Sequence, residues 1–107
     1  MTFMRKPQDT KAVVGNNAFF PCIYTGTRGV PHWLINQTIT HVVSQLPLGH
    51  SYNGTGLIVH NVDVSLNATT YQCCFEIHTG EGFIEETCSS PPGMLIINAG
   101  TGLINSS

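Results

Sequence analysis

The sequence contains little charge, and this scarcity limits what the protein can bind. Only 9% of its 107 residues are Asp, Glu, Lys or Arg, against about 25% in typical soluble domains. The four basic residues, Arg5, Lys6, Lys11 and Arg28, form no stripe along the chain. Because nucleic acids and anionic membranes are bound mainly through clustered basic side chains, the sequence argues against both as partners.

Long apolar runs are missing as well. No stretch approaches the roughly 20 apolar residues of a membrane-spanning helix, and residues 1–6 lack the apolar centre of a signal peptide. We therefore expect the chain to be a segment of a longer protein, with the signal and any membrane anchor outside it. Residues 1–98 are predicted to form one domain, and the small, polar residues 99–107 a tail or linker.

Recognisable catalytic patterns are absent too. A serine hydrolase of the G-x-S-x-G type needs an elbow that the sequence does not contain, and Asp9 and Asp63 are the only aspartates. Glu85 and Glu86 are adjacent, but we expect them on an exposed hairpin without the desolvated pocket that raises a catalytic pKa. The sequence therefore predicts that the domain is not an enzyme and uses no cofactor.

Five histidines are present, at His32, His41, His50, His60 and His78. A zinc site needs three or four ligands that converge on one point. His32 and His41, with His78 as a further candidate, could share the outer face of one sheet, but their spacing does not indicate convergence. The histidines are therefore interpreted as ordinary surface residues, and no metal site is predicted.

Cysteines and glycosylation motifs point outside the cell. The chain has an even number of cysteines, Cys22, Cys73, Cys74 and Cys88, and none lies in the C-x-x-C spacing typical of zinc sites. It also has four N-x-S/T acceptor motifs, at Asn36, Asn53, Asn67 and Asn105. Disulfides persist in oxidising compartments, and glycans on these motifs would supply the surface solubility that the scarce charge does not. An extracellular location is therefore predicted.

Short alternating segments separated by turn residues indicate an all-β domain. Alternation along 18–22 puts Ala18, Phe20 and Cys22 on one buried face. Pro7 interrupts the first strand, because an interior position of a sheet would not tolerate proline. Strands are expected at 3–5, 11–14, 18–22, 32–36, 38–44, 57–62, 70–77 and 93–98. Residues 24–30 and 47–56 are expected to be loops.

The spacing of four core residues identifies the fold. Trp33 follows Cys22 by eleven residues, and Tyr71 stands two residues before Cys73. Upstream runs a Leu57-x-Val59-x-x-Val62 pattern. Together these motifs resemble the immunoglobulin superfamily over roughly residues 3–98. The departures are Asn67 and Thr69, where the family usually has Asp and Gly or Ala.

The resemblance implies a two-sheet antiparallel Greek-key sandwich with Leu57 and Val59 in the core. It also implies a Cys22–Cys73 disulfide between the sheets, with Trp33 packed beside it, and a Tyr71 hydroxyl that bonds nearby backbone. The separation of 51 residues between the two cysteines is short for the variable type. With the broken first strand, it favours the intermediate set, typical of adhesion molecules and receptor tyrosine kinase ectodomains.

The remaining cysteines are predicted to pair with each other. Four cysteines allow three pairings, and a bridge between neighbouring Cys73 and Cys74 would need a strained ring. Strand alternation turns Cys73 inward and Cys74 outward. We therefore expect Cys22–Cys73 and Cys74–Cys88.

The sequence around the second pair predicts a hairpin. Gly80-Glu81-Gly82 suits a three-residue loop that ends in a left-handed glycine. Pairing Thr79 with Phe83 then places Cys74 directly opposite Cys88. The hairpin residues are interpreted either as a solvated surface or as a recognition site, and they are Glu76, Glu81, Phe83, Ile84, Glu85 and Glu86.

Function is predicted from the resemblance. It implies an ectodomain module of an adhesion molecule or a receptor, such as a receptor tyrosine kinase. The module would bind a protein ligand or a second copy of itself, through the hairpin or the sheet face of Trp33 and Cys73. Outward apolar candidates for such a surface are Phe19, Leu34, Val43 and Ile84. The alternatives are a structural spacer and a soluble recognition protein.

Overall fold

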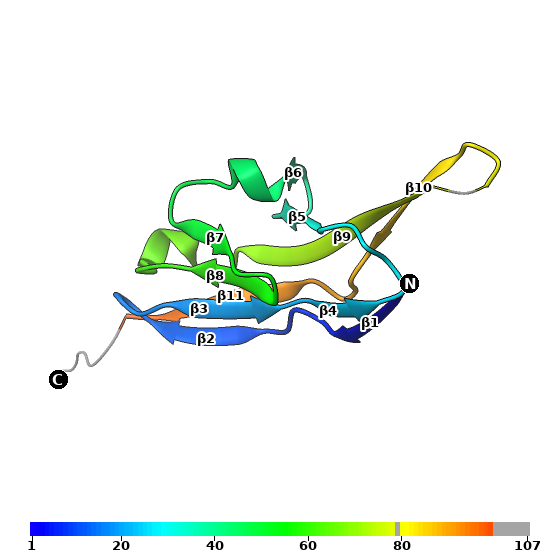
Figure 1. Cartoon of the computed structure of the whole chain (residues 1–107). Coiled ribbons are helices and arrows are strands. Elements are labelled where there is room, and N and C mark those ends of the chain that lie inside the picture. Colours follow the sequence, from blue (N-terminus) through cyan, green and yellow to red (C-terminus); the bar gives the residue numbers. More distant parts are fainter. Residues whose placement is uncertain (79, 100–107) are drawn as a thin grey trace, which may run out of the picture.

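The computed structural model describes residues 1–78 and 80–99, and within them the chain forms eleven strands and two short 3₁₀ turns (Figure 1). The strands in the first half are β1 (Thr2–Arg5), β2 (Thr10–Val13), β3 (Ala18–Pro21), β4 (Ile23–Thr25), β5 (His32–Ile35) and β6 (Ile39–His41). The others are β7 (His50–Tyr52), β8 (Gly56–Val59), β9 (Thr70–His78), β10 (Ile84–Cys88) and β11 (Gly93–Asn98). The turns are η1 (Val43–Gln45) and η2 (Val64–Leu66).

The strands build two facing sheets and a further two-stranded sheet. One sheet has the order β2-β11-β9-β5-β6, with β10 as a further partner of β9. The facing sheet has the order β3-β8-β7, and β1 pairs with β4. Every pairing is antiparallel except that of β11 with β2. The chain therefore has the predicted all-β, two-sheet sandwich architecture.

The interruption predicted at Pro7 separates two strands that belong to different sheets. β1 pairs with β4, whereas β2 pairs with β11 of the larger sheet. Pro7 lies between them and is buried. Because proline has no N–H to donate to a ladder, the chain leaves one sheet here and joins the other.

The core lies between the sheets and is filled by alternate residues of their strands. Trp33, Leu57, Val59 and Tyr71 are all fully buried, and the rings of Phe20 and Tyr71 are 4.5 Å apart. The Cys22–Cys73 disulfide crosses the core with a Cα–Cα distance of 6.4 Å, which lies within the usual range for such bridges. The residues of the predicted core signature thus all lie inside the sandwich.

Two of the predicted loops contain strands. β4 overlaps the start of the predicted loop 24–30, where Tyr24 packs its ring 4.3 Å from that of Phe75. β7 lies in the predicted loop 47–56 and pairs with β8. Gly26, Pro47 and Gly49 nearby are typical turn residues, and for this reason the local composition predicted loops. Pairing with β1 and β8 nevertheless makes these segments strands.

The strand predicted at 38–44 is shorter than expected. β6 ends at His41, and η1 follows it. β6 belongs to one sheet and β7 to the other, so the chain must cross the sandwich at this point. Val43 consequently packs against the core, and its assignment to an outward surface was wrong. Of the other outward candidates, Phe19 and Ile84 are exposed and Leu34 is half-buried.

Candidate recognition hairpin

β9 extends beyond the sandwich. Its residues 71–74 pair with β5, but β5 begins at His32, the partner of Cys74. Residues 74–78 of β9 pair with β10 on the other side. The end of β9 and β10 thus form a two-stranded ribbon, which projects from the end of the molecule where β1 lies (Figure 1).

The ribbon has the predicted register. Ile84 pairs with His78, and Cys88 lies directly opposite Cys74. Gly82 has a φ of 85°, a left-handed conformation that glycine adopts without steric cost. Thr79 lies outside the described residues, so its predicted pairing with Phe83 stays a prediction.

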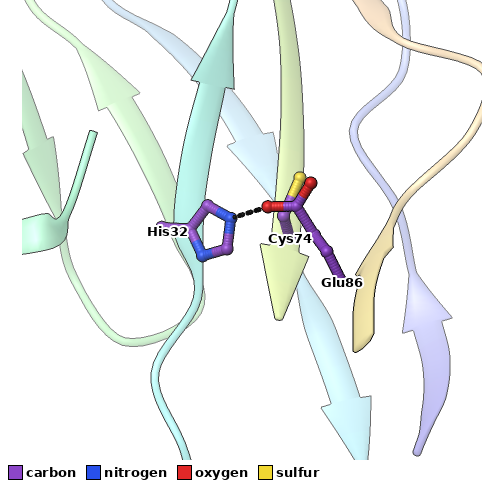
Figure 2. Close-up of side chains that lie close together, drawn as sticks. All are labelled: His32, Cys74 and Glu86. Carbon is purple, nitrogen blue, oxygen red and sulfur yellow. Dashed lines mark hydrogen bonds and ion pairs between the residues drawn. The ribbon is translucent and has the colours of Figure 1, made fainter. Parts of the chain in front are cut away.

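The outer face of the ribbon is fixed at its base by a disulfide and an ion pair. Cys74 and Cys88 are bonded as predicted. Beside them, His32 Nε2 lies 2.7 Å from Glu86 Oε2 and joins β5 to β10 (Figure 2). Cys74 faces away from the core, as alternation required, yet it is fully buried and His32 is only 8% exposed. His32 is therefore not the ordinary surface residue that the sequence suggested.

The inner face of the ribbon is fixed at its base by aromatic packing. Phe75 is 2% exposed, and its ring lies 4.3 Å from that of Tyr24 and 5.9 Å from that of Phe3. Tyr24 and Phe3 belong to the paired strands β4 and β1. The ribbon is thus held on both faces where it leaves the sandwich.

Beyond its base, the ribbon exposes apolar and acidic side chains. Phe83 is 66% exposed and Ile84 58%. All four of its glutamates are exposed, and no Lys or Arg occurs between Cys74 and Cys88. Glu76 and Glu86 stand directly opposite each other in the register, and like charges in such positions repel. The ribbon therefore presents a negative surface together with two exposed apolar side chains.

A hollow lies along one side of the ribbon. Its volume is about 550 Å³, and it is lined by Met1, residues 26–30, His32 and residues 75–78. Val30 in this lining is 63% exposed, and Arg28 brings a positive charge. The hollow thus places a concave surface beside the projecting hairpin.

The predicted grouping of His32, His41 and His78 on one outer face is wrong for His41. His41 pairs with Trp33, and directly paired residues point to the same face of a sheet. His41 therefore lies on the inner side of β6, whereas His32 pairs with Cys74 on the outer side. Glu86 was predicted in the hairpin, but its contact with His32 was not.

Three side chains bring potential metal ligands close together. One ligand atom from each of His32, Cys74 and Glu86 lies within 4.8 Å of the other two (Figure 2). The sulfur of Cys74 is bonded to Cys88, however, and metals bind the thiolate of cysteine. In the oxidised protein this cluster is therefore a structural clamp.

The hydroxyl of Tyr71 bonds a side chain and not the nearby backbone that the resemblance implied. Its oxygen lies 2.9 Å from His50 Nε2, and His50 Nδ1 lies 3.1 Å from the Leu48 carbonyl oxygen. A neutral imidazole satisfies both contacts, since Nδ1–H donates to Leu48 and Nε2 accepts from Tyr71. Burial lowers the pKa of His50 and raises the pKa of Tyr71 to about 12.

Three of the four glycosylation motifs lie within the described residues, and their asparagines are exposed. Asn36 Oδ1 accepts from the backbone N–H of Thr70, and Asn67 Oδ1 from that of Ile97. Both asparagines therefore lie near the start of β9, at the end away from the hairpin. Asn53, in the turn between β7 and β8, accepts from Thr55 and Gly56, and Asn105 lies outside the described residues.

No family model matches the sequence, and no curated protein matches it. Solved structures match in fold. D1 of Duf (Kirre) has a TM-score of 0.70 at 20% identity, covering 92% of this chain and 97% of that one. The Ig1-2 module of the Drosophila receptor protein tyrosine phosphatase DLAR has a TM-score of 0.63 at 20% identity, covering 94% and 50%.

The eight N-terminal Ig domains of Down Syndrome Cell Adhesion Molecule isoform 1.30.30 also match, with a TM-score of 0.69 at 18% identity. The match covers 95% of this chain but only 14% of that one. This chain is thus the size of one domain within such assemblies. Its fold is that of an immunoglobulin-like domain. Among residues 1–78 and 80–99, no helix is long and apolar enough to cross a membrane.

Proposed function

We propose that this chain is an extracellular recognition module of a cell-surface adhesion molecule or receptor, and that its β9–β10 hairpin contacts a protein partner. The observation that carries the proposal is a hairpin that projects beyond the sandwich and is fixed at its base on both faces. A surface element that is ordered before binding loses less entropy when it binds. Two disulfides support an oxidising, extracellular setting.

The chemistry of the hairpin surface suits a protein partner. Phe83 and Ile84 offer exposed apolar area, and apolar and aromatic side chains surrounded by a polar rim are typical of binding sites. The rim carries the four glutamates, so the complementary surface would carry Lys or Arg. Charge complementarity of this kind accelerates association and excludes wrong partners.

We further propose that glycans occupy Asn36, Asn53, Asn67 and Asn105. In the three described motifs the side-chain oxygen is held by backbone N–H groups, while the residue itself is exposed. The hairpin contains no such motif. Glycans at Asn36 and Asn67 would cover the opposite end of the sandwich and leave the hairpin open.

Self-association would use the larger sheet rather than the hairpin. Two hairpins in contact would bring two sets of four glutamates together, with only Arg28 of each adjoining hollow as a basic group. β6 at the sheet edge offers Ile39, which is 59% exposed, and nearby Val42, which is 49% exposed. Sedimentation velocity over a wide concentration range tests this, and a dimer abolished by Ile39→Lys supports the sheet surface.

The intermediate set remains the proposed subtype. Its support is the interrupted first strand, with β1 paired to β4 and β2 to β11. A parent protein such as a receptor tyrosine kinase is compatible with this subtype.

A binding screen with a matched pair of variants tests the proposal. The domain, displayed as a multimer, is applied to an array of cell-surface ectodomains that includes the domain itself. Ile84→Ser alters the hairpin, and Ile39→Ser alters β6 at an almost equal exposure, 58% against 59%. We expect Ile84→Ser to abolish binding to an ectodomain on the array, and Ile39→Ser to leave that binding unchanged.

The other outcomes are equally informative. Loss of binding with Ile39→Ser alone would move the contact to the sheet and contradict the hairpin proposal. Wild-type protein that binds no ectodomain would favour a spacer role. Circular dichroism of each variant confirms that a loss of binding does not come from unfolding.

A further inference from the structure

Four potential metal-binding side chains meet at the base of the hairpin, from three neighbouring strands. β5 supplies His32, β9 supplies Cys74, and β10 supplies Glu86 and Cys88. The ligand atoms of His32, Cys74 and Glu86 already lie within 4.8 Å of one another, and the sulfur of Cys88 is bonded to that of Cys74. Figure 2 shows the imidazole of His32, the sulfur of Cys74 and the carboxylate of Glu86 close together. The Cys74–Cys88 bond adds a second sulfur beside them.

The two disulfides of the domain differ in accessibility. Cys22 and Cys73 are both fully buried in the core. In the outer disulfide, Cys74 is fully buried but Cys88 is half-buried. Because thiol–disulfide exchange requires a thiolate to reach a sulfur atom, a mild reductant would attack Cys88 first and leave the core bridge intact.

We propose that reduction of the Cys74–Cys88 disulfide converts the base of the hairpin into a zinc site. A dithiol reductant attacks the sulfur of Cys88, the S–S bond breaks, and Cys74 leaves as a thiolate. The second thiol of the reductant then releases Cys88 and closes its own cyclic disulfide, so that two electrons pass to the protein. Zn²⁺ binds both thiolates, and the protons of the two thiols go to solvent.

The ligand set and its geometry suit zinc. Zinc takes four ligands in a tetrahedron, at about 2.3 Å to sulfur and about 2.0–2.2 Å to nitrogen or oxygen. Neighbouring ligand atoms in such a tetrahedron lie about 3.4–3.8 Å apart, so His32 Nε2 and Glu86 Oε2 would separate from 2.7 Å to admit the ion. The strands already pair His32 with Cys74 and Cys74 with Cys88, so the ligands need little rearrangement.

A bound ion would keep the hairpin fixed after its disulfide is lost. The disulfide joins β9 to β10, and the His32–Glu86 pair joins β5 to β10. One Zn²⁺ would join all three strands through a single centre. The site does not depend on the proposed protein partner, and its test needs none.

Titration with Co²⁺, a spectroscopic substitute for Zn²⁺, tests the proposal. The domain is reduced with dithiothreitol until peptide mapping shows that Cys74 and Cys88 are free while Cys22–Cys73 remains intact. After removal of the reductant, we expect one equivalent of Co²⁺ to produce the visible bands of tetrahedral cobalt and a thiolate charge-transfer band, both of which Zn²⁺ removes. The oxidised domain is expected to show neither.

Variants separate a four-ligand site from simple thiol binding. Glu86→Gln and His32→Gln are each expected to weaken Co²⁺ binding at least about tenfold, the loss typical of groups that support a metal site. Glu85→Gln removes the neighbouring carboxylate and should leave the affinity unchanged. Absence of the bands, equal affinity of all three variants and wild type, or unfolding on reduction of the outer disulfide would each overturn the proposal.

Discussion

Mild acid is expected to destabilise the domain through His50. Burial lowers the pKa of this imidazole from its ordinary 6.5, and its two nitrogens already contact Leu48 and Tyr71. The unfolded chain therefore takes up a proton near pH 6.5, whereas the folded domain does so only at lower pH. The contribution of the neutral His50 to the free energy of unfolding is consequently fully present above about pH 6.5. It is lost as the pH falls towards the pKa of the folded state.

The size of this effect follows from proton linkage. One proton bound by the unfolded state alone lowers the free energy of unfolding by at most about 1.4 kcal/mol per pH unit. Urea denaturation between about pH 7.5 and about pH 5 covers the window in which the loss begins. We expect the wild-type free energy of unfolding to decrease over this pH range as His50 of the unfolded chain takes up its proton.

A matched pair of histidine variants isolates the contribution of His50. His50→Gln removes the buried imidazole, so its stability should depend less steeply on pH than that of the wild type. His78→Gln removes an exposed imidazole and should retain the wild-type slope. A His50→Gln domain that loses stability as steeply as the wild type would refute the assignment of the acid effect to this residue.

Three further substitutions test the packing, each by its urea denaturation midpoint. Trp33→Ala should lower stability by about 3–5 kcal/mol, and an unchanged midpoint would show that the core is misassigned. Replacing Cys74 and Cys88 together by Ser opens a loop of 14 residues and should cost about 3 kcal/mol; a cost near zero would mean that the hairpin does not need its bridge. Phe75→Ala, at a residue 2% exposed, should cost far more than Phe19→Ala, at one 37% exposed, and equal costs would contradict the proposed anchoring of the hairpin base.

Local features of the sequence were sufficient to predict the hairpin. The Gly80-Glu81-Gly82 loop sets the register, and the strands on either side follow within a few residues. The same register places Cys74 opposite Cys88 without information from elsewhere in the chain. Trp33 and Tyr71 were assigned to the core because their spacing from the cysteines resembles a known family.

Contacts between residues distant in sequence could not be predicted in this way. His32 and Glu86 are 54 residues apart, and nothing near either residue indicates its partner. His50 meets Tyr71 across the two sheets, on a strand whose glycine- and proline-rich neighbourhood suggested a loop. Both pairs depend on how the sheets are arranged, which the local pattern of a strand does not specify.

The central claim is that the recognition hairpin is ordered before any partner binds. NMR relaxation of the hairpin backbone amides tests this claim most directly. The backbone order parameters of Ile77, Ile84 and Glu85 report whether the ribbon moves relative to the sandwich on the nanosecond scale. A ribbon held on both faces predicts values close to those of a rigid backbone, about 0.85. Values below about 0.6 in the oxidised domain would show a flexible loop and contradict the account.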